Sequence, residues 1–378
     1  MNDIASTPRP RWGDRRRARF LVRGLHLDIP LLIILLVLTA LGLVVLYSAS
    51  SQDHDMMIRQ FTRLGIAFAM MLVFAQIPPH YYEIWAPWIY GAGVLLLIAV
   101  LLFGDEGKGA QRWLDLGIFR FQPSEMMKIA VPLMISWYFS ESPLPPTRPQ
   151  LIKALVLILI PAALIIQQPD LGTSLLIVSS GAFVILLAGI PWRYVGSSLL
   201  AMAAMTPVLW YSMHDYQRAR VLNFINPERD PLGSGYHIIQ SKIAIGSGGL
   251  FGKGWLQGTQ SHLQFLPERS TDFIFAVLSE EFGLIGVLAL LTIYALVITR
   301  GLYIASIARS SFSRLLCGSL IMTFFVYAFV NIGMVSGLLP VVGLPLPMVS
   351  YGGTSMVTMM AAFGIMMSIQ THRKLLSS

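Results

Sequence analysis

Long runs of apolar residues, separated by short polar turns, recur along almost the whole chain. A helix needs about 20 apolar residues to cross the hydrocarbon core of a bilayer, and the runs here have roughly that length. Gly, Pro and charged residues bound them, and turns as short as 189–192 are typical of helical hairpins. The pattern therefore predicts an all-α integral membrane protein with about ten transmembrane helices. The expected spans are 29–48, 60–77, 84–103, 123–140, 151–167, 172–190, 193–212, 273–299, 314–337 and 352–371.

The segments between these spans predict the domain organisation. Basic residues in short loops mark the cytoplasmic side, and an Arg-rich stretch precedes the first span. We expect a cytoplasmic tail over 1–28, one polytopic membrane domain over 29–371 and a second cytoplasmic tail over 372–378. A long outer loop, 213–271, separates the seventh and eighth spans and contains a short amphipathic helix over 235–245, followed by several glycines. Loops of such length are often functional.

Composition agrees with this pattern and excludes several classes of protein. Hydrophobic residues make up 55% of the 378 residues and charged residues 12%, which is about half the charged share of a soluble domain. Much of the net charge of +8 lies in the Arg-rich tail, so it indicates membrane orientation rather than nucleic acid binding. The single cysteine, Cys317, excludes a disulfide framework and a Cys-based zinc site. The sequence contains no Walker A, HExxH or GxSxG motif, which argues against an ATP-driven engine.

Charged side chains inside a membrane span, or at its mouth, are costly, so each is a functional candidate. Glu125 and Lys128 are three residues apart, share one helical face and can neutralise each other. The pair is either a structural ion couple or part of a site. Asp170, in the short outer turn 168–173, is either a cap for the next helix or a member of the same polar cavity.

Asp272 stands where the long loop enters the eighth span. It is either a first-turn acid favoured by the helix dipole or a general base, because partial desolvation at the membrane edge makes a carboxylate more basic. Glu280 follows eight residues later on the same helix, which places it roughly 12 Å deeper. That depth is too great for chemistry at the outer face, so we expect a structural pairing role for Glu280.

Four basic residues near the outer face complete the candidate set: Lys108, Arg112, Arg218 and Arg220. Arginine side chains match phosphate oxygens in two-point contacts, although lipid head groups attract the same side chains. Together with the carboxylates, these residues are candidates to hold a pyrophosphate and a sugar at once.

Five short blocks in order along the chain carry a family resemblance. They are Gly109–Trp113, Gln122–Glu125 with Lys128, Gln168–Thr173, Leu266–Glu268 with Thr271–Ile274, and Ser350–Ser355. With these blocks, the chain from Ile29 onward resembles the SEDS family (shape, elongation, division and sporulation), which are bacterial peptidoglycan glycosyltransferases. The segment Asp230–Lys242, together with Gly252–Trp255, is more similar to the elongation polymerases of the family than to its division polymerases.

The resemblance implies an inverting glycosyltransferase in the inner membrane of a bacterium, which polymerises lipid II into glycan strands during cell elongation. Lipid II is a disaccharide-pentapeptide carried on undecaprenyl pyrophosphate. The family's essential aspartate matches Asp272, which would take the proton of the acceptor GlcNAc 4-hydroxyl. Further functional positions of the family match Glu125, Lys128 and Asp170. Arg, Lys or a divalent cation such as Mg²⁺ would hold the charge of the leaving pyrophosphate.

The resemblance also implies protein partners: a class B penicillin-binding protein with transpeptidase activity, and other membrane proteins of the elongation complex. Two other functions stay open on the residues alone. A polar membrane cavity with paired charges also suits a lipid II flippase, and a scaffold for the penicillin-binding protein needs no catalytic residue. The expected position of Asp272 at the outer edge, rather than at the midplane, favours the polymerase.

Overall fold

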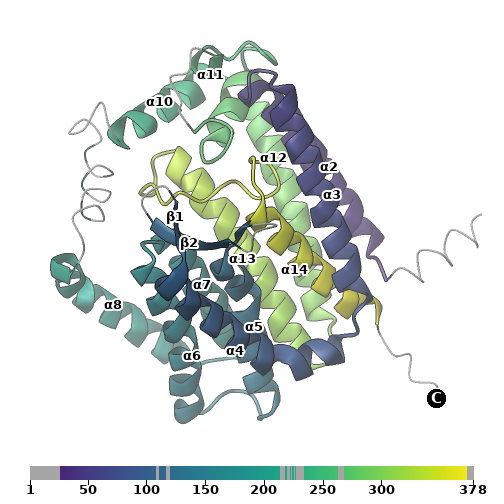
Figure 1. Cartoon of the computed structure of the whole chain (residues 1–378), viewed down its shortest axis with the longest axis vertical. Coiled ribbons are helices and arrows are strands. Elements are labelled where there is room, and N and C mark those ends of the chain that lie inside the picture. Colours follow the sequence, from purple (N-terminus) through teal and green to yellow (C-terminus); the bar gives the residue numbers. More distant parts are fainter. Residues whose placement is uncertain are drawn as a thin grey trace, which may run out of the picture.

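The computed structural model describes residues 26–107, 110–115, 120–212, 234–262 and 268–372, together with the single residues 218, 222, 224 and 226. The described chain is mostly helical, and Figure 1 shows its long helices side by side in one bundle. The long helices are α2 (Ile29–Ala49), α3 (His54–Gln76), α4 (Pro79–Phe103), α5 (Pro123–Ser140), α6 (Arg148–Gln167), α7 (Leu171–Leu187), α8 (Trp192–Ser212), α12 (Ile274–Ser306), α13 (Ser311–Val335) and α14 (Thr354–Thr371).

Each expected span coincides with one of these helices to within a few residues. Within the described chain, six of the helices are long and apolar enough to cross a bilayer: α2, α3, α4, α6, α12 and α13. Helix α3 begins at His54, earlier than expected, because the carboxylate of Asp53 caps it and accepts a hydrogen bond from Met56 N. These apolar helices identify an integral membrane protein.

A small antiparallel sheet lies between α4 and α5, so the all-α prediction is wrong in this detail. Its strands are β1 (Asp105–Gly107), β2 (Ala110–Asp115) and β3 (Arg120–Phe121), in the order β1-β2-β3. Alternation of apolar and polar residues identifies a strand only over four to eight residues, and two of these strands are shorter than that. The sheet matters because β2 carries Arg112.

Helix α13 lies at the centre of the bundle, where it packs against α5, α7 and α12. Three of its polar residues, Thr323, Tyr327 and Asn331, follow one another at intervals of four and therefore line one face. All three are buried. In a helix surrounded by apolar side chains, such a stripe must find hydrogen-bond partners inside the protein.

The described part of the long segment 213–271, which the sequence predicts to be an outer loop, contains the expected amphipathic helix, α10 (Ser234–Ser247), and a short second helix, α11 (Thr259–His262). Figure 1 shows both at one end of the bundle, with α8 at its edge. Helix α10 packs on α12 and α13, so the loop folds back over the bundle. Cys317 is fully buried, as expected for a small apolar residue.

Candidate active site

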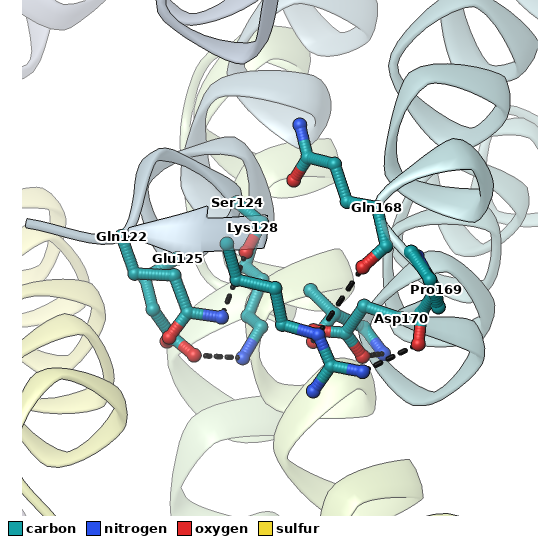
Figure 2. Close-up of polar contacts among 9 residues, drawn as sticks. Gln122, Ser124, Glu125, Lys128, Gln168, Pro169 and Asp170 are labelled. Carbon is teal, nitrogen blue, oxygen red and sulfur yellow. Dashed lines mark hydrogen bonds and ion pairs between the residues drawn. The ribbon is translucent and has the colours of Figure 1, made fainter. Parts of the chain in front are cut away.

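The sequence places Glu125 and Lys128 in the first turns of α5. Pro123 occupies the first helical position, where its missing N–H is not needed. Lys128 Nζ lies 2.7 Å from Glu125 Oε1, so the expected pairing is confirmed. Both side chains are buried, and Figure 2 shows them next to the turn that carries Asp170.

Tyr327 is the second partner of Lys128, and charge-based reasoning on the sequence missed it. Lys128 Nζ donates to Tyr327 Oη at 3.1 Å and lies 4.9 Å from the centre of its ring. The sequence does indicate a partner for Tyr327, because it is a polar residue within an apolar run. Polar groups in membrane spans need partners as charged groups do. Lys128 is thus held from α5 and α13 at once.

One oxygen of the Glu125 carboxylate is not used by the protein. Oε2 is buried and has no hydrogen-bond partner among the residues that the structure describes. Glu125 and Lys128 line a partly open pocket of about 40 Å³ between α5, α13 and α14, whose wall is otherwise mainly apolar, with Phe324, Met359 and Phe363 among its residues. Because a buried carboxylate oxygen needs a donor, this end of the pocket is suited to a hydroxyl or amide of a ligand.

Asp170 combines the two roles that the sequence left open. It is the N-cap of α7, where its carboxylate accepts hydrogen bonds from Thr173 N at 3.1 Å and Thr173 Oγ1 at 3.0 Å. Its Oδ2 also lies 3.8 Å from Arg112 Nε. Figure 2 shows Asp170 on the turn that faces the Glu125–Lys128 pair.

Arg112 holds the turn that carries Asp170. Its Nε donates to Gln168 O at 3.2 Å, and Nη2 donates to Pro169 O (Figure 2). Its side chain is 32% exposed. These contacts make Arg112 a support of the site, because two of its five N–H donors hold the turn that carries Asp170.

Asp272 lies just before α12, whose N-cap is Phe273, so Asp272 is neither the cap nor a residue of the first turn. Its side chain is half-buried. Asn331 Nδ2 donates to Asp272 O at 2.9 Å and to Leu344 O at 2.6 Å. A Cβ built on Gly343 would lie 3.6 Å from Asp272 Oδ2. The carboxylate therefore lies against the backbone of the loop between α13 and α14.

This loop, 336–353, links Asp272 to the other charged groups. On one side, Ser350 Oγ donates to Thr271 O, and Tyr351 N donates to Ser270 O at 2.8 Å. On the other side, Leu344 packs in one apolar cluster with Tyr327. The loop thus connects the segment that carries Asp272 to the wall of the Lys128 site.

The other candidates take different places. Arg218 donates to Trp210 O at 3.0 Å and to Tyr211 O at 2.8 Å, both at the end of α8. Lys108 and Arg220 lie outside the described residues. Glu280 pairs with Lys253 at 2.7 Å, which confirms the expected structural pairing. Across the described parts of the chain, no three His, Cys, Asp or Glu side chains gather as a metal site, so the divalent cation stays a prediction.

His237, on α10, contacts Phe273, the residue that follows Asp272. Its ring stacks on that of Phe273, with 5.7 Å between the centroids and 24° between the planes. Burial lowers the pKa of His237, and the nearby carboxylate of Glu268 opposes this effect. The amphipathic helix thus reaches the start of α12.

Comparison with known proteins identifies the family. The sequence pattern of the FtsW/RodA/SpoVE family of cell cycle proteins matches residues 29–375. This chain belongs to that family. The match covers the whole membrane domain that the apolar runs predict, including every described candidate residue.

Relatives within the FtsW/RodA/SpoVE family match nearly the whole chain. A protein of Escherichia coli K12 named peptidoglycan glycosyltransferase MrdB is 58% identical over 353 residues, which cover 93% of this chain and 95% of that protein. A chain in a solved peptidoglycan synthase complex is 32% identical, with a TM-score of 0.81 over 92% of this chain and 99% of its own. The crystal structure of RodA from Thermus thermophilus is 28% identical, with a TM-score of 0.70 over 92% and 98%.

Proposed function

We propose that this family member is a peptidoglycan glycosyltransferase that polymerises lipid II into glycan strands during cell elongation. Its family and the name of its Escherichia coli relative support the activity. The observation that carries the site assignment is the placement of Asp272: a half-buried carboxylate just outside α12, against the loop that reaches the Lys128 site.

The proposed reaction is an inverting displacement at the anomeric carbon of the donor. Asp272 accepts the proton of the acceptor 4-hydroxyl as its oxygen attacks. A bond forms between that oxygen and the anomeric carbon, while the bond from the anomeric carbon to the lipid pyrophosphate breaks. The pyrophosphate leaves with the electron pair, and positive groups of the site stabilise its charge.

The Glu125–Lys128 pair is proposed to bind polar groups of a substrate. Glu125 Oε2 offers a buried acceptor, and Lys128 carries three N–H donors, of which Glu125 and Tyr327 use two. An acceptor beside a donor fits the hydroxyl and amide groups of an N-acetylated sugar. Asp170, supported by Arg112, forms the neighbouring wall. Lys108, Arg218 and Arg220 stay proposed contacts of the lipid pyrophosphate or of lipid head groups.

The topology proposed for the chain has ten membrane spans, one for each long helix, with the 213–271 loop outside. Both tails, 1–28 and 372–378, are proposed to lie in the cytoplasm below the bacterial inner membrane. The stacked rings of His26 and His372, with centroids 3.7 Å apart, support a shared side for the two ends. Ten spans return the C-terminus to the side of the N-terminus, in agreement with this contact.

A class B penicillin-binding protein is the proposed partner, together with other membrane proteins of the elongation complex. The similarity to a chain of a peptidoglycan synthase complex supports an assembly of this kind. A transpeptidase held beside the polymerase would cross-link strands as they emerge.

The test is polymerisation of fluorescent lipid II by the purified full chain in detergent, with and without the partner. We expect glycan polymer from the wild type and none from Asp272→Asn or Asp272→Ala, with unchanged partner binding and thermal midpoint. Asp53→Asn, an exposed cap on α3, is the matched control and should stay active. Substantial polymer from Asp272→Asn would reject the base assignment. No polymer from the wild type with its partner would favour the flippase or scaffold instead.

A further inference from the structure

Helix α12 is not continuous. Gly283 has φ 62° and ψ −160°, which are not helical values, and it divides the 33-residue helix Ile274–Ser306 in two. The first part, 274–282 (the half-helix), follows Asp272 after one residue, and Ile274 through Glu281 are all buried. A break in a membrane helix exposes backbone groups that need partners within the protein.

The glycine-rich segment 248–254 of the outer loop provides these partners. Leu284 N donates to Gly249 O at 3.0 Å, and Ile285 N donates to Leu250 O at 3.2 Å. In the opposite direction, the N–H groups of residues 253 and 254 donate to the carbonyls of residues 280 and 281, each at 3.0 Å. The segment and the break at Gly283 therefore form one interlocked unit, which we call the clasp.

The clasp requires glycine at its contact points. A Cβ on Gly248 would come within 2.0 Å of Ser279 O, and one on Gly252 within 2.1 Å of Glu281 O. A Cβ on Gly283 would come within 2.3 Å of Gly252 N. Since Gly252 and Gly283 also have positive φ values of 78° and 62°, the two backbones approach as closely as they do only without side chains.

An ion pair between the half-buried Lys253 and the buried carboxylate of Glu280 closes the clasp. Lys253 Nζ lies 2.7 Å from Glu280 Oε1, and the Glu280 side chain is 0% exposed. Thr259 Oγ1 and Gln260 N lie 3.1 and 3.0 Å from the same oxygen. Beyond the clasp, Trp255 Nε1 donates to Val44 O on α2 at 3.2 Å. The inner end of the half-helix is thus fixed to the loop and, through it, to a neighbouring helix.

We propose that the clasp is a positioning device for Asp272, with Lys253 and Glu280 as positioning residues of the polymerase reaction; this rests on the proposed function. The half-helix is held at two points: Asn331 and the loop 336–353 hold its outer end, and the clasp holds its inner end. Because the break uncouples it from 284–306, the clasp rather than helix continuity sets its position. A small displacement at the inner end is carried to Asp272, where about 1 Å can change a rate by about 100-fold.

The test compares Lys253→Met, Glu280→Gln and Lys253→Arg with Lys153→Met, which removes an exposed lysine of α6. Lys253→Met and Glu280→Gln should lower kcat for lipid II by about 10- to 100-fold with the KM nearly unchanged, because the substrate contacts stay in place. Lys253→Arg should recover most of the rate. Hydrogen exchange should rise over 268–282 and not over α14.

A merely structural role of the pair gives different readings. Equal kcat values for Lys253→Met, Glu280→Gln and Lys153→Met would overturn the proposal, as would a change confined to the thermal midpoint. If Lys253→Met fails to fold, the kcat of Glu280→Gln tests the proposal instead. This variant keeps the shape of the side chain and its bond from Gln260 N. Asp272→Asn is measured in parallel. An inactive Asp272→Asn with an unaffected Glu280→Gln rejects the clasp alone, whereas an active Asp272→Asn rejects the base.

Discussion

Two lysine–glutamate ion pairs in this molecule have the same chemistry and different surroundings, and in both the carboxylate is buried. Lys128 Nζ lies 2.7 Å from Glu125 Oε1, and Lys253 Nζ lies 2.7 Å from Glu280 Oε1. The Glu280 oxygen accepts further hydrogen bonds from the loop at 259–260. In contrast, Glu125 Oε2 has no hydrogen-bond partner among the described residues, and the residue lines a pocket. The carboxylate of the first pair can still accept a hydrogen bond from a ligand, whereas the bonded oxygen of the second pair is already surrounded by donors of the protein.

The difference shows that burial and charge alone do not identify a site. A buried charge that lacks hydrogen bonds costs folding free energy, so an unfilled carboxylate oxygen indicates that a ligand completes it. A carboxylate whose bonds are complete can hold the backbone in place but has no acceptor left on that oxygen for substrate. The completeness of hydrogen bonding therefore separates the binding pair from the positioning pair.

The largest effect is expected from Lys128→Met. The substitution removes the charge that neutralises Glu125 in a buried site, which should cost about 3–5 kcal/mol of stability. Polymerisation should fall by about 100-fold or more, because a charged donor beside the reacting groups is lost. The measurements are the thermal midpoint in detergent and the initial rate with fluorescent lipid II. Lys153→Met is the control, and a rate equal to that of the control would remove Lys128 from the site.

The second prediction concerns variants that neutralise each pair completely. Glu125→Gln/Lys128→Met should recover thermal stability to near the wild type, because no unpaired charge is left, but should stay inactive. The double variant Lys253→Met/Glu280→Gln should also recover stability. Its kcat should return to within about tenfold of the wild type, because the backbone hydrogen bonds of the clasp persist. Equal recovery of activity in the two variants would contradict the distinction between binding and positioning.

Local sequence signals predicted much of this arrangement. The apolar runs located the ten long helices, because helix length in a membrane is set by bilayer thickness. The spacing of Glu125 and Lys128 predicted their pairing within one helix, and the position of Asp170 before α7 included capping among its possible roles. The depth of Glu280 indicated a structural partner, and the structure supplies one. Apart from the partner of Glu280, these features depend on residues close together in the chain.

The features that sequence reasoning missed depend on distant contacts. Tyr327 lies 199 residues from Lys128, and Lys253 lies 27 residues from Glu280. From the sequence, Lys253 is an ordinary loop lysine among several. The break at Gly283 is also hidden, because one glycine in an apolar run is common and no local signal shows that another segment will pair with its backbone.

A smaller effect is expected when each lysine loses a hydroxyl partner. Tyr327→Phe removes an acceptor of Lys128 in the buried site and should cost about 1–3 kcal/mol of stability, with roughly a tenfold loss of rate. Thr259→Val removes an acceptor of Lys253 and a donor to Glu280 Oε1. Residue 259 is exposed, so water can replace the hydroxyl, and Lys253 and Gln260 N still donate to Glu280; the rate should therefore change less than about threefold. The initial rates and thermal midpoints of the two variants check this. A larger loss of rate in Thr259→Val than in Tyr327→Phe would contradict the prediction that the Glu125–Lys128 pair matters more for the reaction.

The smallest effect concerns the pH dependence of stability at the start of the half-helix, where His237 stacks on Phe273. Burial lowers the pKa of His237 below its ordinary value of 6.5, although Glu268 opposes the shift. The unfolded chain therefore binds a proton more readily than the folded chain as the pH falls below that value, and the folded state loses stability.

The measurement is the thermal midpoint at about pH 7.5 and at about pH 5.5. The midpoint should fall between these two pH values in the wild type and in the exposed control His80→Gln, and it should fall less in His237→Gln. Because Asp272 directly precedes Phe273, the same acidification should raise hydrogen exchange over 268–282 in the wild type. Parallel midpoints in all three proteins would show that the contact between α10 and the half-helix does not depend on His237 being neutral.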